Sequence, residues 1–381
     1  TNTTGSDITS VGRASLRANT TGYGNSALGV NALNANTTGQ KNVSIGGYST
    51  DANTTGSYNT ALGHEALSSN TTANSNTGIG YKALFANTTG ASNTTVGTNS
   101  LDANTTGSNN VAMGQSALGT STTGSYNTAL GSNSLVLNTT ASNNTAVGYQ
   151  ALYANTANNN TALGHSALFS NTTGSLNAGI SQSALYSNTT GNDNTAAGVN
   201  AMYLNTTGSS NVGLGKDALR SNTTASENTA VGFQASGNNT TGTQNVSIGH
   251  NTARLTTTGR ENTNVGKGSM YYNTTGSYNT TLGKEALQNN TTASDNTAVG
   301  YKAGYSNTTG GNNVSVGEQA GYANTIYGNN AYFGEWSGRN TNTANNTFIG
   351  QQSGYSITTG SKNTILGRYN GNQGGLDIRT S

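Results

Sequence analysis

The sequence predicts an all-β protein, a parallel β-solenoid (β-roll) of about 22 coils with a 17-residue repeat, and three observations support this fold class. A glycine returns every 17 residues from Gly12 to Gly367 and closes 22 copies of one pentapeptide, interrupted only by two one-residue deletions and by Ser181 in one glycine slot. The chain holds 53 glycines, no proline and only 7% charged residues, and its Asn, Thr and Ser recur at fixed positions, unlike the composition of disordered chains. Seventeen residues also suit one solenoid turn, whereas helical repeats and propeller blades need longer units.

The pentapeptide predicts a short strand at positions −4 to 0, counted from the closing glycine as position 0. Asn occupies −4 in 21 of 22 copies, and Leu, Ile, Val or Met occupies −1 in 20 of 22. Position −3 is mostly Thr or Val and −2 is mostly small, an alternation that is typical of a strand. We expect −3 and −1 to face the core, because −1 carries a large apolar side chain. Representative residues of the repeat are Asn59, Leu62, Gly63, Asn127, Leu130, Gly131, Asn296, Val299 and Gly300.

The rest of each copy predicts a corner, a second strand and a turn. Positions +3 and +4 are usually Ala-Leu, as in Ala66-Leu67, and indicate a short second strand after the corner. Asn-Thr-Thr-Gly at +7 to +10, as in Asn87–Gly90, predicts a wide polar turn, because Asn and Gly tolerate positive φ. Stacked at the inter-strand spacing of ~4.8 Å, the coils would make a rod on the order of 100 Å long.

Axial stacking accounts for the scarcity of charge. Identical residues in consecutive coils lie over one another, so a repeated Lys would meet like charges at ~5 Å, a repulsion of ~1 kcal/mol per neighbour even in water. Asn, Thr and Ser can instead hydrogen-bond along a column, as asparagine ladders do. Charged residues survive mainly at +1 and +2, where they vary, as in Lys284-Glu285.

A single chain falls short of the burial that such a fold requires. Each coil offers about two large apolar side chains, at −1 and +4, whose burial contributes ~3–6 kcal/mol. Ordering the residues of one coil costs ~1–2 kcal/mol per residue. The sequence therefore predicts that other copies of the chain supply the missing contacts, and small residues at −2 would let another backbone approach closely. We expect a homotrimer, with the chain itself as its partner.

Several copies of the pentapeptide resemble a known fibre repeat. Asn-Val-Ser-Ile-Gly at Asn42–Gly46 and Asn245–Gly249, and Asn-Val-Ser-Val-Gly at Asn313–Gly317, are similar to the head repeat of trimeric autotransporter adhesins, which implies a trimeric left-handed parallel β-roll. The longer unit, Asn-Thr-Ala-Leu-Gly-x-x-Ala-Leu-x-x-Asn-Thr-Thr-Gly-Ser-x, looks more like repeat regions of bacteriophage tail fibres and related bacterial surface fibres. The segment Gly374–Arg379 is similar to what precedes a cleavable C-terminal trimerisation chaperone in such fibres.

Three segments differ in their repeat. Residues 1–300 form the regular 17-residue-repeat solenoid, residues 301–367 form modified C-terminal coils, and residues 368–381 form an off-repeat exit segment. In the modified coils +4 changes from Leu to Gly, and in the last three copies −2 becomes large. These residues are Gly304, Gly321, Gly338 and Gly354 at +4, and Tyr332, Phe348 and Ile365 at −2. We expect either a differently packed, wider section or a cap that protects the end of the stack.

The sequence predicts no enzyme, no cofactor and no metal site. His64, His165 and His250 all occupy +1 in distant coils, so they cannot share a metal ion within one chain and are expected to be solvated. No phosphate-binding loop, nucleophile elbow or calcium-binding nonapeptide is found in the sequence.

Two positions of the repeat, +7 and +5, suggest glycosylation and sugar binding, respectively. Asn-Thr-Thr at +7 forms an N-glycosylation sequon on a turn expected to be exposed, although a hydrogen-bonded turn ladder explains the same residues. The candidate acceptors are Asn19, Asn36, Asn53, Asn70, Asn87, Asn104, Asn138, Asn171, Asn188, Asn205, Asn222, Asn239, Asn273, Asn290 and Asn307. Aromatic residues at +5 are candidates for stacking on sugars or form a partly buried spine, namely Phe85, Tyr153, Phe169, Tyr186 and Tyr203.

The predicted function is mechanical: the structural shaft of an extracellular trimeric fibre, above all a phage tail fibre that spaces a receptor-binding tip from its base. The alternative is a bacterial surface adhesin or filament whose repeats bind glycans or cells. A third class, an ice-binding solenoid, is disfavoured by the inward position expected for Thr at −3. Host-surface glycans are expected as partners only through a tip outside this chain. The net charge of +2, with scattered Lys and Arg, disfavours nucleic acid, and no apolar run reaches the ~20 residues that membrane insertion needs.

Overall fold

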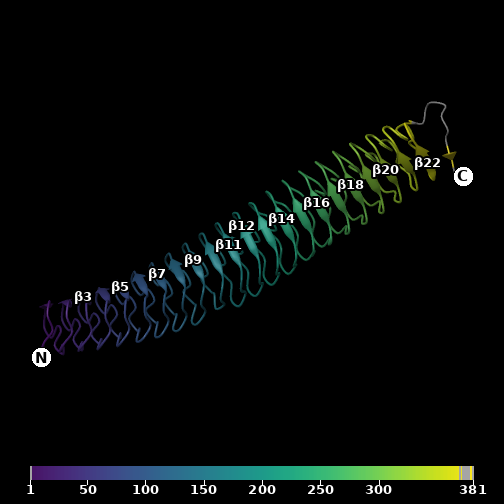
Figure 1. Cartoon of the computed structure of the whole chain (residues 1–381). Coiled ribbons are helices and arrows are strands. Elements are labelled where there is room, and N and C mark those ends of the chain that lie inside the picture. Colours follow the sequence, from purple (N-terminus) through teal and green to yellow (C-terminus); the bar gives the residue numbers. More distant parts are fainter. Residues whose placement is uncertain (1, 369, 371–377, 380–381) are drawn as a thin grey trace. The chain divides into compact units, whose positions relative to one another are not determined.

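The computed structural model describes residues 2–368, 370, 378 and 379. Within this part of the chain it contains strands and turns and no helix. The chain divides into two units, Thr1–Asn192 and Asp193–Ser381. Each unit is a parallel β-solenoid, and together they hold about 21 turns of about 17 residues, each turn contributing one strand (Figure 1). The solenoid fold predicted from the repeat is confirmed.

The strands are short and lie directly before each closing glycine. The first unit holds β1 Thr9–Val11, β2 Ser26–Leu28, β3 Val43–Ile45, β4 Thr60–Leu62, β5 Thr77–Ile79, β6 Thr94–Val96, β7 Val111–Met113, β8 Thr128–Leu130, β9 Thr145–Val147, β10 Thr161–Leu163 and β11 Ala178–Ile180. The second unit holds β12 Thr195–Ala197, β13 Val212–Leu214, β14 Thr229–Val231, β15 Val246–Ile248, β16 Thr263–Val265, β17 Thr280–Leu282, β18 Thr297–Val299, β19 Val314–Val316, β20 Ala331–Phe333, β21 Thr347–Ile349, β22 Asn363–Leu366 and β23 Ile378–Arg379.

Equivalent positions of consecutive coils lie over one another. In β4 and β5, for example, Leu62 is the register partner of Ile79, and both strands run parallel. The backbone ladder continues outside the strands, where the amide of Leu67 donates to the carbonyl of Ala83 one coil further, at 3.0 Å. The predicted alignment of Asn-to-Gly segments is therefore confirmed, although the assigned strand covers only −3 to −1.

The predicted orientation of the strand is wrong. In β4 the −2 residue Ala61 is fully buried, whereas the −1 residue Leu62 is 45% exposed and Thr60 at −3 is only partly covered. The reason is the narrow interior of a 17-residue coil. A Cβ placed on Gly78, at −2, would lie 3.3 Å from Cγ of the inward Leu67, so only a small residue fits opposite the +4 leucine.

The predicted second strand at +3 and +4 is also absent. Positions +1 to +6 are turns, and two residues per coil adopt left-handed backbone there, as Glu65 (φ 58°) and Leu67 (φ 53°) do. Left-handed residues end an extended segment and cost roughly 1–2 kcal/mol each when they are not glycine. Leu67 is nevertheless fully buried, so burial of its side chain offsets that cost.

The core of each coil is half polar. Apolar side chains come from +4, +3 and −2, as Leu84, Ala83 and Ala61 illustrate. The remaining interior is filled by the asparagines at −4 and +7. The Oδ1 atom of Asn42, at −4, accepts from the backbone amide of Asn59 in the next coil at 2.9 Å. These bonds satisfy amide groups that burial would otherwise penalise.

The closing glycine is required by both conformation and space. Gly63 has φ 145°, and a Cβ on it would clash with the carbonyl of Gly80 in the next coil. Few side chains tolerate that backbone conformation. Ser181, the one replacement, has φ 105°.

The two one-residue deletions fall in the turn and leave the strands aligned. Thr145 of β9 remains the register partner of Thr161 of β10, although they are 16 residues apart. The amide of Asn160 still donates to Oδ1 of Asn144 at 2.9 Å. Inside the shortened turn, Nδ2 of Asn155 donates to the carbonyl of Ala157 at 2.7 Å. The turn after +7 therefore absorbs changes in repeat length.

In the modified C-terminal coils the large side chain lies at −2 instead of +4. Tyr332 and Phe348, both at −2, are fully buried, with ring centroids 5.6 Å apart. A Cβ on Gly321 would lie 2.6 Å from Tyr332 Cδ2, and one on Gly354 would lie 2.5 Å from Phe348 Cδ2. The rings thus fill the space that leucine fills elsewhere, so no wider coil is needed to hold them.

The last coil is followed by a strand of opposite direction. β23 pairs antiparallel with β22, so that Asn363 faces Arg379 and Thr364 faces Ile378. The rest of the predicted exit segment, residues 369, 371–377, 380 and 381, lies outside the described residues, as does most of the segment on which the resemblance to chaperone-bearing fibres was based.

Candidate interaction surfaces

An apolar surface runs along the strands of each unit. We call the outward side chains at −3 and −1 of β1–β22 the strand face. Its most exposed −1 residues are Val11, Leu28, Ile45, Leu62, Val96, Met113, Leu163 and Ile180 in the first unit, and Ile248, Leu282, Phe333, Ile349 and Leu366 in the second. Exposed apolar arrays of this extent are rare on monomeric proteins and mark interaction sites.

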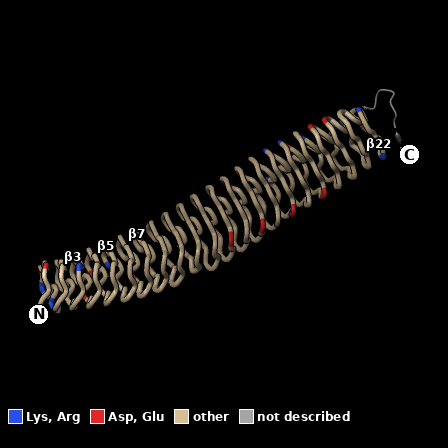
Figure 2. The backbone as a smooth tube through the Cα atoms, viewed as in Figure 1, with Lys and Arg blue, Asp and Glu red and all other residues tan. Residues whose placement is uncertain are grey.

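Charge is sparse over the solenoid. Figure 2 shows Lys, Arg, Asp and Glu scattered singly or in small groups in both units. Where charges recur at +2, their sign alternates: Lys82 Nζ lies 3.5 Å from Glu65 Oε2, and Lys302 Nζ lies 3.5 Å from Glu285 Oε2. The nearby Tyr81 and the Glu65 carboxylate raise the pKa of Lys82. At these +2 positions opposite charges thus follow one another, whereas at +1 like charges occur in consecutive coils, as in Lys267 and Lys284.

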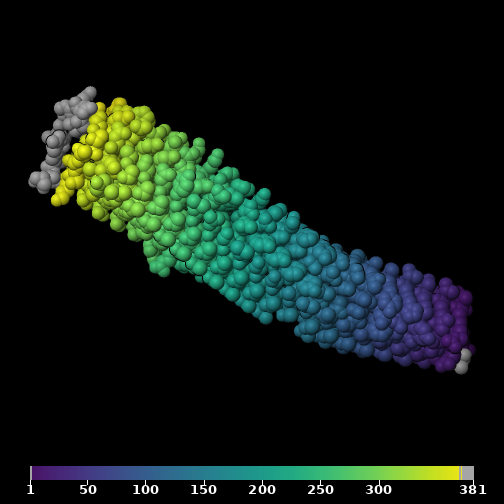
Figure 3. All heavy atoms as spheres, turned by 180° about the vertical axis from the view of Figure 1, so that it is seen from behind, coloured from purple at the N-terminus to yellow at the C-terminus, as the bar shows by residue number. Residues whose placement is uncertain are grey.

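The sequon asparagines are buried, so their predicted exposure on a turn is wrong. Each candidate acceptor at +7 is at most 2% exposed. Nδ2 of Asn53 donates both to Oδ1 of Asn36, at 2.8 Å, and to the carbonyl of Gly56, at 3.0 Å. A glycan on Nδ2 would replace one of its two donated hydrogens and need space beside a side chain that is fully buried. Figure 3 shows the coils of each unit in contact along its outer surface. The alternative interpretation, a hydrogen-bonded turn ladder, describes this column.

The ladder at +7 is interrupted where another residue replaces asparagine. Ser121 follows Asn104 in the column, and both Ser121 Oγ and Asn104 Oδ1 are buried without a hydrogen-bond partner among the described residues. The same occurs at Thr256, which leaves Asn239 Oδ1 without a donor. Unpaired buried polar atoms are costly, so these interruptions weaken the coils that contain them.

The aromatic column at +5 stacks upon itself. The ring centroids of Tyr153 and Phe169 are 5.1 Å apart, as are those of Phe169 and Tyr186, with interplanar angles of 15° and 5°. All three side chains are half-buried. Because their faces cover one another, only the edges are open between them. Phe85 lies beside the ammonium group of Lys82, 5.1 Å from its ring centroid, and Tyr203 lies 5.9 Å from the guanidinium of Arg220. Sugar stacking stays a prediction for all five rings.

The histidines are held by aromatic neighbours in the same column. His64 lies 6.0 Å from Tyr81, measured between ring centroids, and His165 lies 5.4 Å from Tyr149. His250 similarly packs on Phe233 at 5.2 Å. Within the described residues no three His, Cys, Asp or Glu side chains gather into a group able to hold a metal ion.

No family model and no curated protein sequence matches this chain. Its function therefore has to be argued from its own surfaces. A search for membrane-spanning segments in the described residues finds no helix of sufficient length and hydrophobicity.

One surface feature was missed by the sequence reasoning. A cleft of about 370 Å³ opens in the second unit at +5, where Gly237 lies between Arg220 and Arg254 of the neighbouring coils. The signal is a side chain missing from the +5 column between two arginines, rather than a motif; the other glycine at +5, Gly119, has no arginine beside it. Only comparison of each +5 residue with its two neighbours along the column would have revealed it.

Proposed function

We propose that the chain is the structural shaft of an extracellular homotrimeric fibre, such as a phage tail fibre, which holds a receptor-binding tip at a distance from its base. The observation that carries this proposal is the strand face: an uncharged, regularly spaced apolar array on the outside of each unit. A shaft needs length, stiffness and insensitivity to exact repeat number, and stacked coils with a continuous backbone ladder provide all three.

A second copy of the same chain fits the strand face better than an unrelated partner does. Its −3 and −1 side chains recur at the same axial spacing of ~4.8 Å, so the columns of two copies interdigitate over many coils. Burial of one half-exposed −1 side chain contributes on the order of 1 kcal/mol. Contributions of this size from all coils exceed the ~4–15 kcal/mol that association costs.

The oligomeric state tests this proposal. Sedimentation equilibrium of the full chain should give three times the chain mass of 38.5 kDa. The variant Leu62→Glu/Leu163→Glu places charges on the strand face and should give monomers. Leu137→Glu/Leu204→Glu is the matched control, because these leucines are similarly exposed but lie at +6, outside the strands. A monomeric wild-type chain would contradict the trimer.

An adhesin whose repeats bind cells directly remains the alternative within the same fold. Fluorescently labelled chain, incubated with intact host cells, should not bind them if it is only a spacer. Saturable binding that survives washing would favour the adhesin. Immunogold labelling of virions and of bacterial surfaces would then show which extracellular structure carries the chain.

Ice binding gains support from one observation. Thr at −3 lies on the outward side of the strands, against the expectation that disfavoured this class, and Thr60, Thr77 and Thr94 follow one another in register. Such a column repeats hydroxyl and methyl groups at regular spacing. Thermal hysteresis of the purified chain that is lost in Thr60→Leu/Thr77→Leu/Thr94→Leu would favour ice binding. Its absence in wild type would exclude ice binding.

A further inference from the structure

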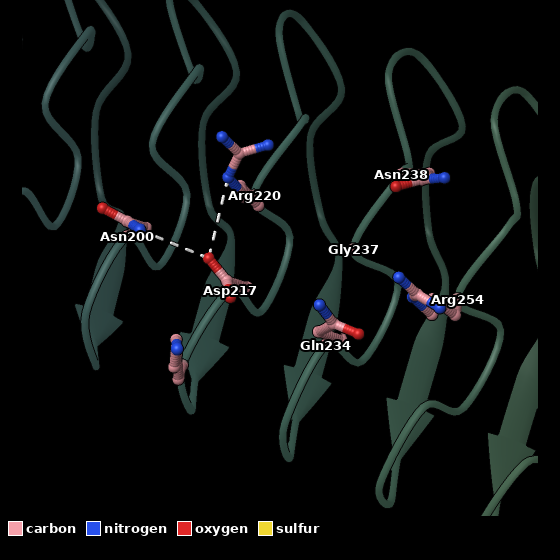
Figure 4. Close-up of a pocket in the computed structure, with 8 residues that line it drawn as sticks. Asn200, Asp217, Arg220, Gln234, Gly237, Asn238 and Arg254 are labelled. Carbon is pink, nitrogen blue, oxygen red and sulfur yellow. Dashed lines mark hydrogen bonds and ion pairs between the residues drawn. The ribbon is translucent and has the colours of Figure 1, made fainter.

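The cleft at Gly237 is a gap in the +5 column. Arg220, Gly237 and Arg254 occupy +5 in three consecutive coils of the second unit, and Figure 4 shows them in this order. Because consecutive coils are ~4.8 Å apart, the two arginines are separated by roughly 10 Å with only a glycine between them. Gln234 and Asn238 complete the rim with amide groups.

The cleft carries an excess of positive charge. Lys216, Arg220 and Arg254 line it together with a single acid, Asp217. The Asp217 carboxylate lies 3.6 Å from Arg220 Nε and accepts from Asn200 Nδ2 at 3.4 Å. The ammonium group of Lys216 has no hydrogen bond or ion pair among the described residues. Three cations therefore line the cleft against one acid, so its net charge is positive.

Both arginines are held in place from the side away from the gap. The guanidinium carbon of Arg220 lies 5.9 Å from the ring centroid of Tyr203, and that of Arg254 lies 5.8 Å from the ring centroid of Tyr271. Nη1 of Arg254 also donates to the Tyr271 hydroxyl at 2.6 Å. These contacts restrict the side chains before any ligand arrives, which lowers the entropic cost of binding.

We propose that this cleft binds an oxyanion group, a sulfate or carboxylate, carried by an acidic polysaccharide. A guanidinium group binds such oxyanions through paired hydrogen bonds, and an arginine borders the cleft on each side of Gly237, so an inserted group meets both. The amides of Gln234 and Asn238 are placed to bond sugar hydroxyls at the rim. The open end of the cleft lets a long chain extend outward, and none of its lining residues lies in a strand. The site is therefore independent of the proposed trimer contact.

Three variants of the full chain separate a built site from general attraction. Arg220→Gln/Arg254→Gln removes both guanidinium groups. Gly237→Tyr refills the +5 column without changing charge; a Cβ at this position would lie 3.3 Å from the Gln234 carbonyl, a close contact that a shift of a few tenths of an ångström relieves. Arg339→Gln is the matched control, since Arg339 also occupies +5 but lies between the rings of Tyr322 and Tyr355 without a gap.

Binding of a sulfated tetrasaccharide, followed by isothermal titration calorimetry at low ionic strength, provides the measurement. We expect the double arginine variant and Gly237→Tyr each to bind about tenfold or more weakly than wild type, and Arg339→Gln to bind like wild type. Uncharged maltotetraose should not bind. If sodium sulfate bound more tightly than the tetrasaccharide, the site would bind free anions and not a polysaccharide.

Two results would overturn the proposal. If Gly237→Tyr binds the tetrasaccharide as wild type does while the arginine variant does not, the attraction is a diffuse charge effect and the cleft plays no part. If a single-stranded oligonucleotide of equal charge binds more tightly than the tetrasaccharide, the ligand class is wrong.

Discussion

The regular coils and the modified C-terminal coils solve the same packing problem in opposite ways. In the regular coils a large residue at +4, such as Leu152, lies against small residues at −2. In the modified coils glycine occupies +4 and an aromatic ring, Tyr332 or Phe348, enters from −2. The strands keep the same parallel register through both regions of the second unit, as β18–β19 and β20–β21 do.

The difference shows which property of the core can change. In the coils closed by Gly334 and Gly350 the ring at −2 supplies the volume that a leucine at +4 supplies elsewhere, so the position that fills the interior can change. The backbone gains from the exchange, because +4 is left-handed in both regions and glycine accepts that conformation at low cost, with Gly338 at φ 59°. The aromatic solution thus relieves strain while keeping the interior filled.

The largest expected effect comes from emptying the modified core. Tyr332→Ala should lower the free energy of unfolding of the C-terminal coils by about 4 kcal/mol, because its ring fills the space beside Gly321 and Gly338. Hydrogen exchange of the amides in these coils measures the loss. Tyr332→Ala/Gly338→Leu should recover most of it if volume alone matters. A loss of unfolding free energy below about 1 kcal/mol in the single variant would contradict the view that the Tyr332 ring replaces the leucine of the regular coils.

Adding one methyl group at +4 tests whether the space beside the Tyr332 ring is already filled. Gly338→Ala should destabilise by about 2 kcal/mol, because the new Cβ clashes with the Tyr332 ring. Gly304→Ala is the matched control with the same φ of 59°. Its Cβ would lie 3.0 Å from Leu287 Cδ2, the end of a flexible side chain, so little change is expected. Urea denaturation compares both variants, and equal losses would contradict the argument.

Alkaline pH should weaken the modified coils selectively. Burial raises the pKa of Tyr332 above its ordinary value of 10.0, and this effect outweighs the opposing effect of the nearby Asn346 side chain. The folded chain therefore keeps the proton while the unfolded chain releases it above about pH 10. Stability is complete below this pH and falls by up to about 1.4 kcal/mol per pH unit above it. Tyr332→Phe should remove this loss, as hydrogen exchange at pH 9 and 11 would show.

A smaller gain is expected from the polar half of the core, which both regions share. Ser121→Asn should raise the free energy of unfolding by about 1 kcal/mol, because the introduced amide can donate to Asn104 Oδ1 and accept from Asn138 Nδ2. The control Thr123→Asn adds the same group at an exposed position of the same turn, and no stabilisation is expected there. Thermal unfolding measures both, and equal melting temperatures would contradict the ladder.

The sequence predicted the period, the place of the strand in each coil and the alignment of coils. It could do so because the closing glycine is needed for its backbone conformation and the asparagines for hydrogen bonds between coils, and both recur visibly in the sequence. It did not predict which strand face is inward. Leu62 is larger and more apolar than Ala61, and only the width of the coil decides that the alanine is buried. The left-handed backbone of Leu67 also leaves no trace in the sequence, because leucine rarely adopts it. The cleft at Gly237 escaped because an absent side chain carries no motif.

The turn that accommodates the one-residue deletions determines which changes in repeat number and repeat length natural or engineered variants can tolerate. Duplication or excision of whole repeats preserves the backbone hydrogen-bond ladder between coils, so the number of repeats can change without new backbone contacts. The segment between Asn155 and Asn160 shows in addition that length can vary inside a repeat while the flanking strands stay aligned. Foreign peptides grafted into this turn, one per coil, would be displayed as an evenly spaced array.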